Sequence, residues 1–96
     1  MLSFEWDEGK ALTNRRKHGV SFTHATSVFF DPHHVDVGRQ RNTLEFRFHL
    51  IGLAEMGVLF VAYTTRCGLI RIISAREATR HETTAYWTNR VLHARC

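Results

Sequence analysis

The chain contains little proline, cysteine and lysine, and these shortages limit the classes of protein to which it can belong. One proline in 96 residues, with a hydrophobic content of 44%, excludes a disordered tail and indicates a folded globule. The two cysteines, Cys67 and Cys96, form no CxxC pair and would form a disulfide only if a turn and the C-terminus met. We therefore expect a reduced, cytoplasmic protein.

Long apolar runs, repeats and low-complexity segments are also missing. No run approaches the length of about 20 residues that spans a membrane. Because the N-terminus is already polar at Glu5, we expect no signal peptide. A chain of 96 residues is long enough for one hydrophobic core. We expect one domain that covers residues 1–96.

Arginine carries most of the positive charge. The net charge is +4 and the pI is about 9.7, which favours an acidic partner such as nucleic acid. Eleven of the thirteen basic residues are Arg, and only Lys10 and Lys17 are Lys. A genome rich in G and C would also favour arginine codons, so the positions of the arginines say more than their number.

The N-terminal residues predict a short strand and a basic helix. Residues 3–6 form the strand, and Asp7 is the N-cap of a helix that runs to about Lys17. Gly19 supplies the left-handed residue after that helix. Polar and basic residues cover most of it, namely Lys10, Asn14, Arg15, Arg16 and Lys17. We expect this helix face to be solvated, or to extend a phosphate-binding surface.

A second helix and a polar stretch follow. Ser21 is the expected N-cap, and Asp31-Pro32 ends the helix. The apolar residues at the spacing of one buried helix face are Phe22, Ala25, Val28 and Phe29. Residues 33–42 predict a short strand at 35–37 followed by a loop.

Adjacent histidines at positions 33 and 34 invite a metal interpretation. No Cys, Asp or Glu at ligand spacing completes the closed ligand set that a structural metal site needs. We therefore expect a solvated loop there, and neither a metal nor another cofactor.

The clearest alternation lies in residues 43–53 and predicts a strand with one apolar and one polar face. The apolar face is Leu44, Phe46, Phe48 and Leu50, and the polar face is Glu45, Arg47 and His49. A turn at residues 54–56 leads to the next strand at 58–66. If Leu53 pairs with Gly57, then Arg47 lies opposite Tyr63 and Glu45 lies opposite Thr65.

The turn after residue 66 decides the face on which Arg71 lies. A two-residue turn at Cys67-Gly68 places Arg71 opposite Thr64, on the core side. A three-residue turn, with Gly68 left-handed, places Arg71 opposite Tyr63. We favour the longer turn because it puts Arg71 on the polar face, whereas the shorter one buries a guanidinium with no evident partner.

An apolar strand joins a helix start in the stretch LIRIISAREATR. Ser74 and Glu77 have the spacing of a capping box, which predicts that the strand stops and a helix begins at Ser74. Arg76 and Arg80 would then share a face at the positive end of the helix, where arginine does not stabilise it. A phosphate bound between Arg71, Arg76, Arg80 and the helix N-terminus would explain these residues.

The last helix, from Ala75 onward, has a weak apolar stripe. Exposed Trp87 or Val91 on it would indicate contact with a partner. Together the elements predict an α+β fold in the order β-α-α-β-β-β-α, apart from the short strand at 35–37. The sheet is expected to be mainly antiparallel, with helices packed on one face.

Several short pieces of sequence, none specific alone, follow one another in a specific order and spacing. They are Phe4-Glu5-Trp6-Asp7; Asn14 with Lys17-His18-Gly19-Val20-Ser21-Phe22; Asp31-Pro32; Glu45 with Arg47; Ile51-Gly52; Val61-Ala62-Tyr63-Thr64 with Arg66; and Arg71-Ile72-Ile73-Ser74-Ala75-Arg76 followed by Ala78, Glu82 and Tyr86. In this order they resemble the BrnT family of bacterial type II toxins, small ribonucleases of the RelE-like superfamily.

The resemblance implies a RelE-like fold and a toxin that cleaves RNA and slows translation. It also implies a BrnA-like antitoxin with a ribbon-helix-helix DNA-binding domain, which neutralises the toxin in a heterotetramer that represses its own operon at operator DNA. The site residues that it implies are Glu45, Arg47, Arg71, Arg76 and Arg80.

RNA cleavage without a metal needs a base for the 2′-hydroxyl proton, cations for the phosphorane and an acid for the leaving 5′-oxygen. Glu45 or His49 is the candidate base, and His49 or a protonated His18 is the candidate acid. The candidate cations are Arg47, Arg71 and Arg76, because the pKa of arginine is too high for ready proton exchange.

RNA binding is assigned to Tyr63, Arg80, Lys17 and His18. Tyr63 would stack a splayed base, which is a common way to hold single-stranded RNA. The ordinary alternatives are a half-buried core tyrosine and a cationic imidazole that the helix dipole stabilises at position 18.

A second class of function needs the same basic surface but neither base nor acid. It is a non-catalytic module that binds an antitoxin or nucleic acid, such as a decayed toxin. Arg71→Lys separates the two classes, because it removes bidentate contacts to a transition state and leaves much of the salt-dependent binding of RNA.

Overall fold

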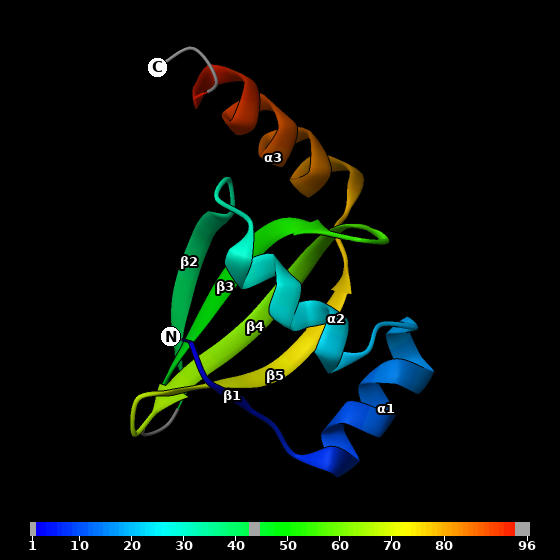
Figure 1. Cartoon of the computed structure of the whole chain (residues 1–96), viewed down its shortest axis with the longest axis vertical. Helices are drawn as coiled ribbons and strands as arrows, with labels where there is room; N and C mark the ends of the chain where they lie inside the picture. Colours follow the sequence, from blue (N-terminus) through cyan, green and yellow to red (C-terminus); the bar gives the residue numbers. More distant parts are fainter. Residues whose placement is uncertain (1, 43–44, 94–96) are drawn as a thin grey trace.

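A computed structural model describes residues 2–42 and 45–93 (Figure 1). The elements along the chain are β1 (Phe4–Glu5), α1 (Glu8–His18), α2 (Phe22–Thr26), the 3₁₀ turn η1 (Ser27–Phe30), β2 (Val35–Asn42), β3 (Glu45–Ala54), β4 (Gly57–Arg66), β5 (Leu69–Glu77) and α3 (Arg80–His93). Thr43, Leu44 and Cys96, on which parts of the sequence analysis fall, lie outside the described residues.

The five strands form one sheet in the order β1-β5-β4-β3-β2. Strands β2 to β5 pair antiparallel in sequence order, and β1 adds to β5 in parallel. Helices α1 and α2 and the turn η1 pack on one face, against β5 and β3. The predicted α+β class, element order and mainly antiparallel sheet are therefore confirmed.

The ends of the first two helices follow the local sequence, as predicted. The Asp7 carboxylate accepts a hydrogen bond from the Lys10 backbone N–H at 2.9 Å. Gly19 is left-handed after α1, with φ of 73°. The Ser21 hydroxyl accepts from the His24 backbone N–H at 3.1 Å, but α2 ends at Thr26, earlier than predicted, and the chain continues as η1 to Phe30.

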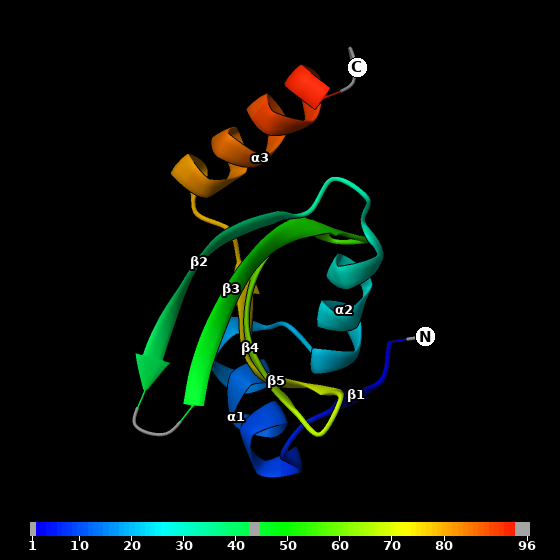
Figure 2. The same cartoon turned by 90° about the vertical axis from the view of Figure 1, so that its left-hand side faces the viewer.

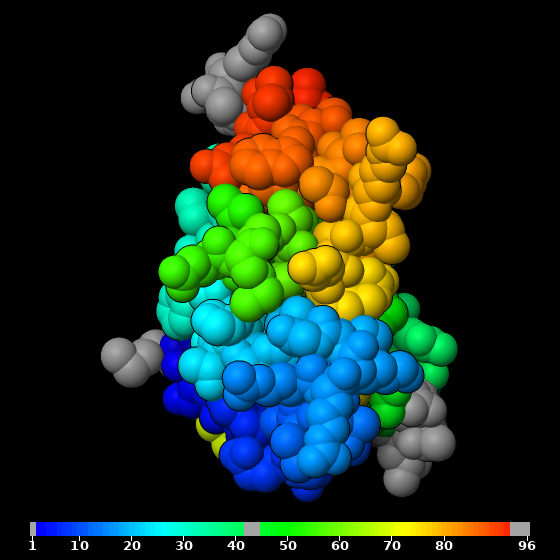
Figure 3. Space-filling view, turned by 90° about the vertical axis from the view of Figure 1, so that its right-hand side faces the viewer, coloured from blue at the N-terminus to red at the C-terminus, as the bar shows by residue number. Residues whose placement is uncertain are grey.

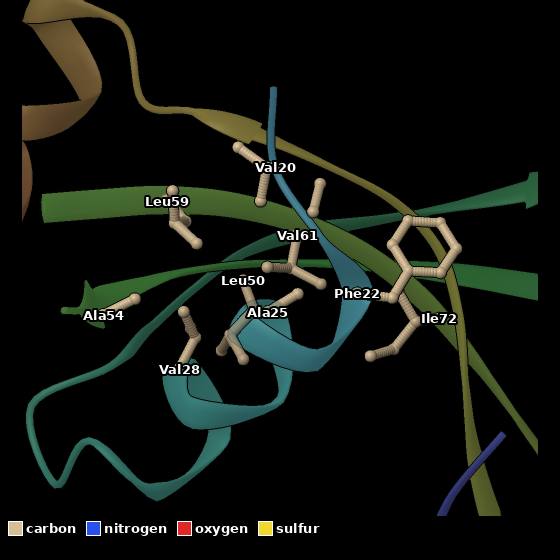
Figure 4. Packing of buried hydrophobic residues seen from close by; sticks show 10 residues of the cluster. Val20, Phe22, Ala25, Val28, Leu50, Ala54, Leu59, Val61 and Ile72 are labelled. Atoms are coloured by element: carbon tan, nitrogen blue, oxygen red, sulfur yellow. The ribbon is translucent and has the colours of Figure 1, made fainter. Parts of the chain in front are cut away.

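The main core lies between α2, η1 and the sheet, as Figure 4 shows. Its buried residues are Val20, Phe22, Ala25, Val28, Leu50, Ala54, Leu59, Val61, Ile72 and Ala75. Gly52 allows η1 to approach β3 closely, because a Cβ at that position would lie 2.5 Å from the Val28 Cγ1 atom. The alternation of β3 thus buries one strand face under the helices.

Asn14 joins α1 to the edge of β5, which corrects the prediction that its helix face is solvated. Strand β1 pairs with Ile70 and Arg71, so among the described residues the later part of β5 has no neighbouring strand on the side away from β4. The buried Asn14 amide donates to the carbonyl oxygens of Ala75 at 2.8 Å and Val20 at 3.0 Å. Its oxygen accepts from the Ala75 N–H at 3.1 Å, so the amide pairs both backbone groups of Ala75.

The polar stretch 33–42 is more regular than predicted. The expected strand at 35–37 with a following loop is wrong, because β2 extends over Val35–Asn42 and pairs with β3 along its length. A bulge between Asp36 and Gly38 interrupts the register. Arginine alternates with other polar residues in this stretch, so the alternation of apolar and polar side chains that indicates a strand is missing.

The register between β3 and β4 differs by one residue from the prediction. Leu53 pairs with Val58, not with Gly57, and Ala54 pairs with Gly57. The hairpin turn is therefore the two residues 55–56. Phe48 lies opposite Tyr63, so Tyr63 shares the helix-covered face with Phe48 and not the polar face with Arg47.

The turn between β4 and β5 is the two-residue turn that we did not favour. Cys67 and Gly68 both have positive φ, of 52° and 78°, as a tight hairpin turn needs, and Arg71 pairs with Thr64. Because the preceding register also differs by one residue, the two errors cancel. Arg71 therefore lies on the polar face with Arg47, although for another reason than predicted.

The last helix starts at Arg80, five residues later than the capping box at Ser74 predicts. Ser74 and Glu77 belong to β5, where they pair with Ala62 and Leu59. The box that forms is Thr79 with Glu82: the Thr79 hydroxyl accepts from the Glu82 N–H at 3.1 Å, and the Glu82 carboxylate accepts from the Thr79 N–H at 2.8 Å. Pairing with β4 outweighs the equivalent local signal at Ser74.

Helix α3 lies beyond one end of the sheet, on the far side from α1 (Figures 1 and 3). Its fully buried Tyr86 packs with Ile51 and Val58 in a second apolar cluster. Trp87 and Val91 are 42% and 58% exposed, as a partner-binding helix end would require. None of the helices in the described ranges combines the length and the apolar character needed to cross a bilayer.

Candidate functional site

The polar face of the sheet lies opposite α1 and α2, and Figure 2 shows α2 on the other side of the strands. Paired residues of neighbouring strands point to the same side of a sheet. We call this side the arginine face and define it by Glu45, Arg47, His49, Arg71 and Arg76. The structure thus brings all five predicted catalytic residues to one face.

Small side chains form the floor of the arginine face. Ala62 pairs with both His49 and Ser74, and Thr64 pairs with Arg71. Ala62 and Thr64 are only 7% and 3% exposed although α1 and α2 lie on the other side. The longer side chains around them therefore cover this floor and form the rim of a shallow site.

Two arginines on or beside this face lie near carboxylate groups. Arg71 lies 3.3 Å from Glu5, which β1 brings alongside β5, and Arg66 lies 3.8 Å from Glu45. Glu5 is the partner that the sequence analysis could not name. The ion pair removes the objection that the short turn would leave the guanidinium without a partner.

Arg76 is the most firmly held of the cations. Its two terminal nitrogens donate to the two Glu82 carboxylate oxygens at 2.8 and 3.1 Å, and its guanidinium carbon lies 4.1 Å from the centre of the Phe60 ring. The hydrogen bonds from Arg76 lower the pKa of Glu82 despite the opposing effect of burial. The centroid of the His49 ring lies 5.2 Å from that of the Phe60 ring.

Arg47 differs from the other cations of the face. Within residues 2–42 and 45–93 it forms no ion pair. Its Nε atom is buried and has no hydrogen-bond partner there. An unpaired buried donor costs about 1–3 kcal/mol, so local stability does not explain the position of this guanidinium.

Lys17 and His18 lie beside the arginine face rather than on it. They line a groove of about 480 Å³ between α1 and β5, together with Lys10, Ile73 and Ser74. Ser74 pairs with Ala62, which in turn pairs with His49. The groove therefore opens at the β5 side of the same floor.

Two predicted residues lie elsewhere than expected. Arg80 is the exposed first residue of α3, whereas Arg76 is in β5, so the two do not share a helix face. Tyr63 lies on the helix-covered side with its ring 4.9 Å from that of Phe29. Burial raises the pKa of Tyr63, and the negative charge of Asp36 raises it further.

Sequence reasoning missed the supporting residues Glu5, Phe60 and Glu82. The spacing of Thr79 and Glu82 was a visible capping box that could have placed Glu82 at the start of α3. No local signal pairs Glu5 with Arg71, because the two residues meet only through the sheet.

The two adjacent histidines bind Asp31 rather than each other. The His33 backbone N–H donates to the Asp31 carboxylate at 2.9 Å, and His34 Nδ1 lies 2.8 Å from the Asp31 carbonyl oxygen. No group of three or more His, Cys, Asp or Glu residues that could hold a metal occurs in the described part of the chain.

The arginine face combines bidentate donors, an imidazole and a carboxylate around a floor of small residues. This arrangement can bind a phosphodiester and move protons beside it, as a ribonuclease requires. Residues 6–82 match the family described as the ribonuclease toxin, BrnT, of a type II toxin-antitoxin system, and the chain belongs to this family. No curated protein matches the chain.

Proposed function

We propose that the chain is a metal-independent endoribonuclease that cleaves RNA on the arginine face. The observation that carries the proposal is Arg47, a partly buried guanidinium whose Nε has no partner in the described residues. It stands in β3 two residues from His49 and on the same face as Arg71. A phosphodiester would complete its hydrogen bonding.

We assign the base to His49 and the acid to His18. His49 removes the 2′-hydroxyl proton, the 2′-oxygen attacks phosphorus, and the bond to the 5′-oxygen breaks as His18 gives that oxygen a proton. The products are a 2′,3′-cyclic phosphate and a free 5′-hydroxyl. In-line displacement needs base and acid on opposite sides of the phosphorus. Ala62 and Ser74 lie between His49 and the groove of His18 in the order of the strand pairing.

Arginines stabilise the charge of the phosphorane in this proposal. Arg47 and Arg71 act on its equatorial oxygens, and Arg76 acts through the position of the Phe60 and His49 rings. Glu45 is the alternative base, but it lies beside Arg66 and two residues further from the floor than Arg47. Lys17 and Arg80 hold the RNA strand on either side.

The cellular part of the proposal follows from the family. A type II toxin has a cognate antitoxin, and we propose a BrnA-like ribbon-helix-helix partner that neutralises this chain in a heterotetramer and binds operator DNA. The toxin acts in the cytoplasm, where RNA cleavage inhibits translation. Exposed Trp87, Val91 and Leu92 on α3 offer apolar contact area for such a partner.

Cleavage of a fluorescent RNA by the purified protein, in excess EDTA, tests the enzymatic part. Arg47→Ala should lower kcat/KM by about 10²–10³-fold, in the range of one lost transition-state donor, and His49→Gln should act similarly. Arg47→Lys keeps the charge and should restore RNA binding more than cleavage. Arg16→Ala, on the exposed side of α1, is the matched control.

The outcomes separate the two classes of function. The ribonuclease assignment is supported if the wild type cleaves RNA in EDTA and if Arg47→Ala and His49→Gln lower kcat/KM by the expected factor while their circular dichroism stays normal. A folded wild type that binds RNA or antitoxin but cleaves nothing overturns it in favour of a non-catalytic binding module. Growth arrest on induced expression, with and without the antitoxin, tests toxicity and neutralisation.

A further inference from the structure

A second site lies on the other side of the same strands. A recess of about 400 Å³ is lined by Asp36, Gly38 and Arg39 from β2, Phe48 from β3 and Tyr63 from β4. It is on the helix-covered side of the sheet, where Tyr63 adjoins the η1 residue Phe29. The arginine face on the opposite side uses none of these residues.

The bulge in β2 builds this recess. Residues three apart in a regular strand point to opposite faces, yet Asp36 pairs with Leu50 and Arg39 pairs with Phe48, both on the helix-covered side. The extra residue in the bulge makes this arrangement, and Gly38 takes a φ of 125° within it. A carboxylate and a guanidinium therefore border the same recess.

Aromatic rings form the floor. The Phe48 and Tyr63 rings are tilted by 31° with centroids 5.4 Å apart, and Phe29 holds the Tyr63 ring from the side. Both rings are half-buried, so each is fixed and still reachable. Such a floor suits a flat heterocycle, because stacking on aromatic side chains is worth about 1–3 kcal/mol for each base.

Two guanidiniums lie next to the recess. Arg39 and Arg41 approach the Phe46 ring at 5.2 and 5.6 Å, and that ring is 42% exposed. Neither arginine forms an ion pair with an acidic residue of the described ranges. Their positive charge is free to meet a phosphate just outside an aromatic floor.

We propose that this recess binds a guanine nucleotide of single-stranded RNA. The base stacks on Phe48 and Tyr63, its N1–H and N2–H groups donate to the Asp36 carboxylate, and Arg39 with Arg41 holds the phosphate. An ionised carboxylate only accepts hydrogen bonds, and guanine alone among the four bases offers two adjacent donors on its Watson–Crick edge. The inference rests on the proposed function only in taking RNA as the polymer.

Titration of the ¹⁵N-labelled full chain with GMP, AMP, CMP and UMP tests the recess directly. GMP should shift the amide signals of Gly38 and Arg39 and should bind at least about tenfold more tightly than AMP, which is within the range for one bidentate base contact. Asp36→Asn, which is isosteric, should remove that preference. Tyr63→Leu should weaken all four nucleotides alike.

Several results would overturn the inference. They are equal affinity of GMP and AMP for the wild type, an unchanged preference in Asp36→Asn, or GMP shifts confined to residues of the arginine face. Glu55→Gln, in the exposed β3–β4 turn, is the charge-matched control and should bind GMP as the wild type does. Circular dichroism of each variant confirms that it folds.

The two proposals fail separately. Arg47→Ala should bind GMP normally and cleave RNA about 10²–10³-fold more slowly, whereas Asp36→Asn should still cleave RNA and lose its preference for guanine-containing sites. A wild type that cleaves RNA without binding GMP refutes the recess alone. A wild type that binds GMP through Asp36 but never cleaves RNA refutes the ribonuclease assignment alone.

Discussion

The two faces of the sheet differ in how completely their polar groups are paired. On the helix-covered face the buried Asn14 side chain makes three hydrogen bonds, to Val20 and Ala75. On the arginine face two buried polar atoms, Arg47 Nε and Glu5 Oε2, have no partner in the described residues. The buried amide on the first face is fully paired, whereas the two unpaired atoms on the second face cost some stability.

Leu59→Ala in the main core should have the largest effect on stability. Leu59 is fully buried between the sheet and the helices, so the cavity should lower the free energy of unfolding by about 2–5 kcal/mol. Urea denaturation measures it. Leu12→Ala on α1, where Leu12 is 52% exposed, is the control, and an equal loss in both variants would contradict the assigned core.

Asn14→Ala should come next. It leaves the backbone N–H and C=O of Ala75 without partners, and the expected loss is about 2–3 kcal/mol. Amide hydrogen exchange at Ala75 should speed up more than exchange elsewhere in β5. Thr13→Ala, at the exposed neighbouring position, should leave both quantities nearly unchanged.

Acid should weaken the contact between α3 and the rest of the fold. Burial disfavours the charged form of Asp31, but hydrogen bonds from Tyr86, Leu53 and His33 outweigh it and lower its pKa below 3.8. A lowered pKa contributes stability that is fully present above the unfolded value and is lost as pH falls through the folded value. This window lies below about pH 4.

Asp31→Asn isolates that contribution. It should cost about 1–2 kcal/mol at neutral pH, and the difference from the wild type should shrink on acidification below pH 4. Urea midpoints across pH provide the measurement, with Tyr86→Phe as the partner variant because its hydroxyl donates to Asp31. A difference independent of pH would show that shape, not charge, matters at this position.

Arg47→Met should have the smallest effect on stability. It removes a buried donor that has no partner among residues 2–42 and 45–93, so the free energy of unfolding should change by less than about 0.5 kcal/mol or should rise. Arg71→Met leaves Glu5 without its ion-pair partner and should cost more, about 1 kcal/mol. The reverse order would show that Arg47 supports the fold.

Local signals in the sequence were predictive where the chain itself supplies the partner. Asp7, Gly19 and Ser21 set the helix ends because their hydrogen bonds span only a few residues. Ser74 and Thr79 both head a capping-box pattern, and only pairing of β5 with β4 decides between them. Propensity alone could not rank these two signals.

Candidate site residues on one strand were predicted better than those joined across strands. Glu45, Arg47 and His49 share a face by alternation alone, and the structure keeps them together. Tyr63 was placed on the wrong face, because one residue of register reverses a strand. Whether Arg47 has a partner among the described residues depends on side chains from the neighbouring strands, so no local sequence pattern could predict that it has none.

The amide of Asn14 also pairs backbone groups at the edge of the sheet, where an open sheet leaves them unpaired. Beyond Arg71 the edge of β5 away from β4 has no neighbouring strand in the part of the chain that the structure describes, and exposed edges of this kind recruit strands from other chains. A side-chain amide has the same kinds of donor and acceptor as a peptide bond, so Asn14 forms with Ala75 the two hydrogen bonds that a neighbouring strand would form. One helix residue thereby closes the edge at Ala75 against aggregation.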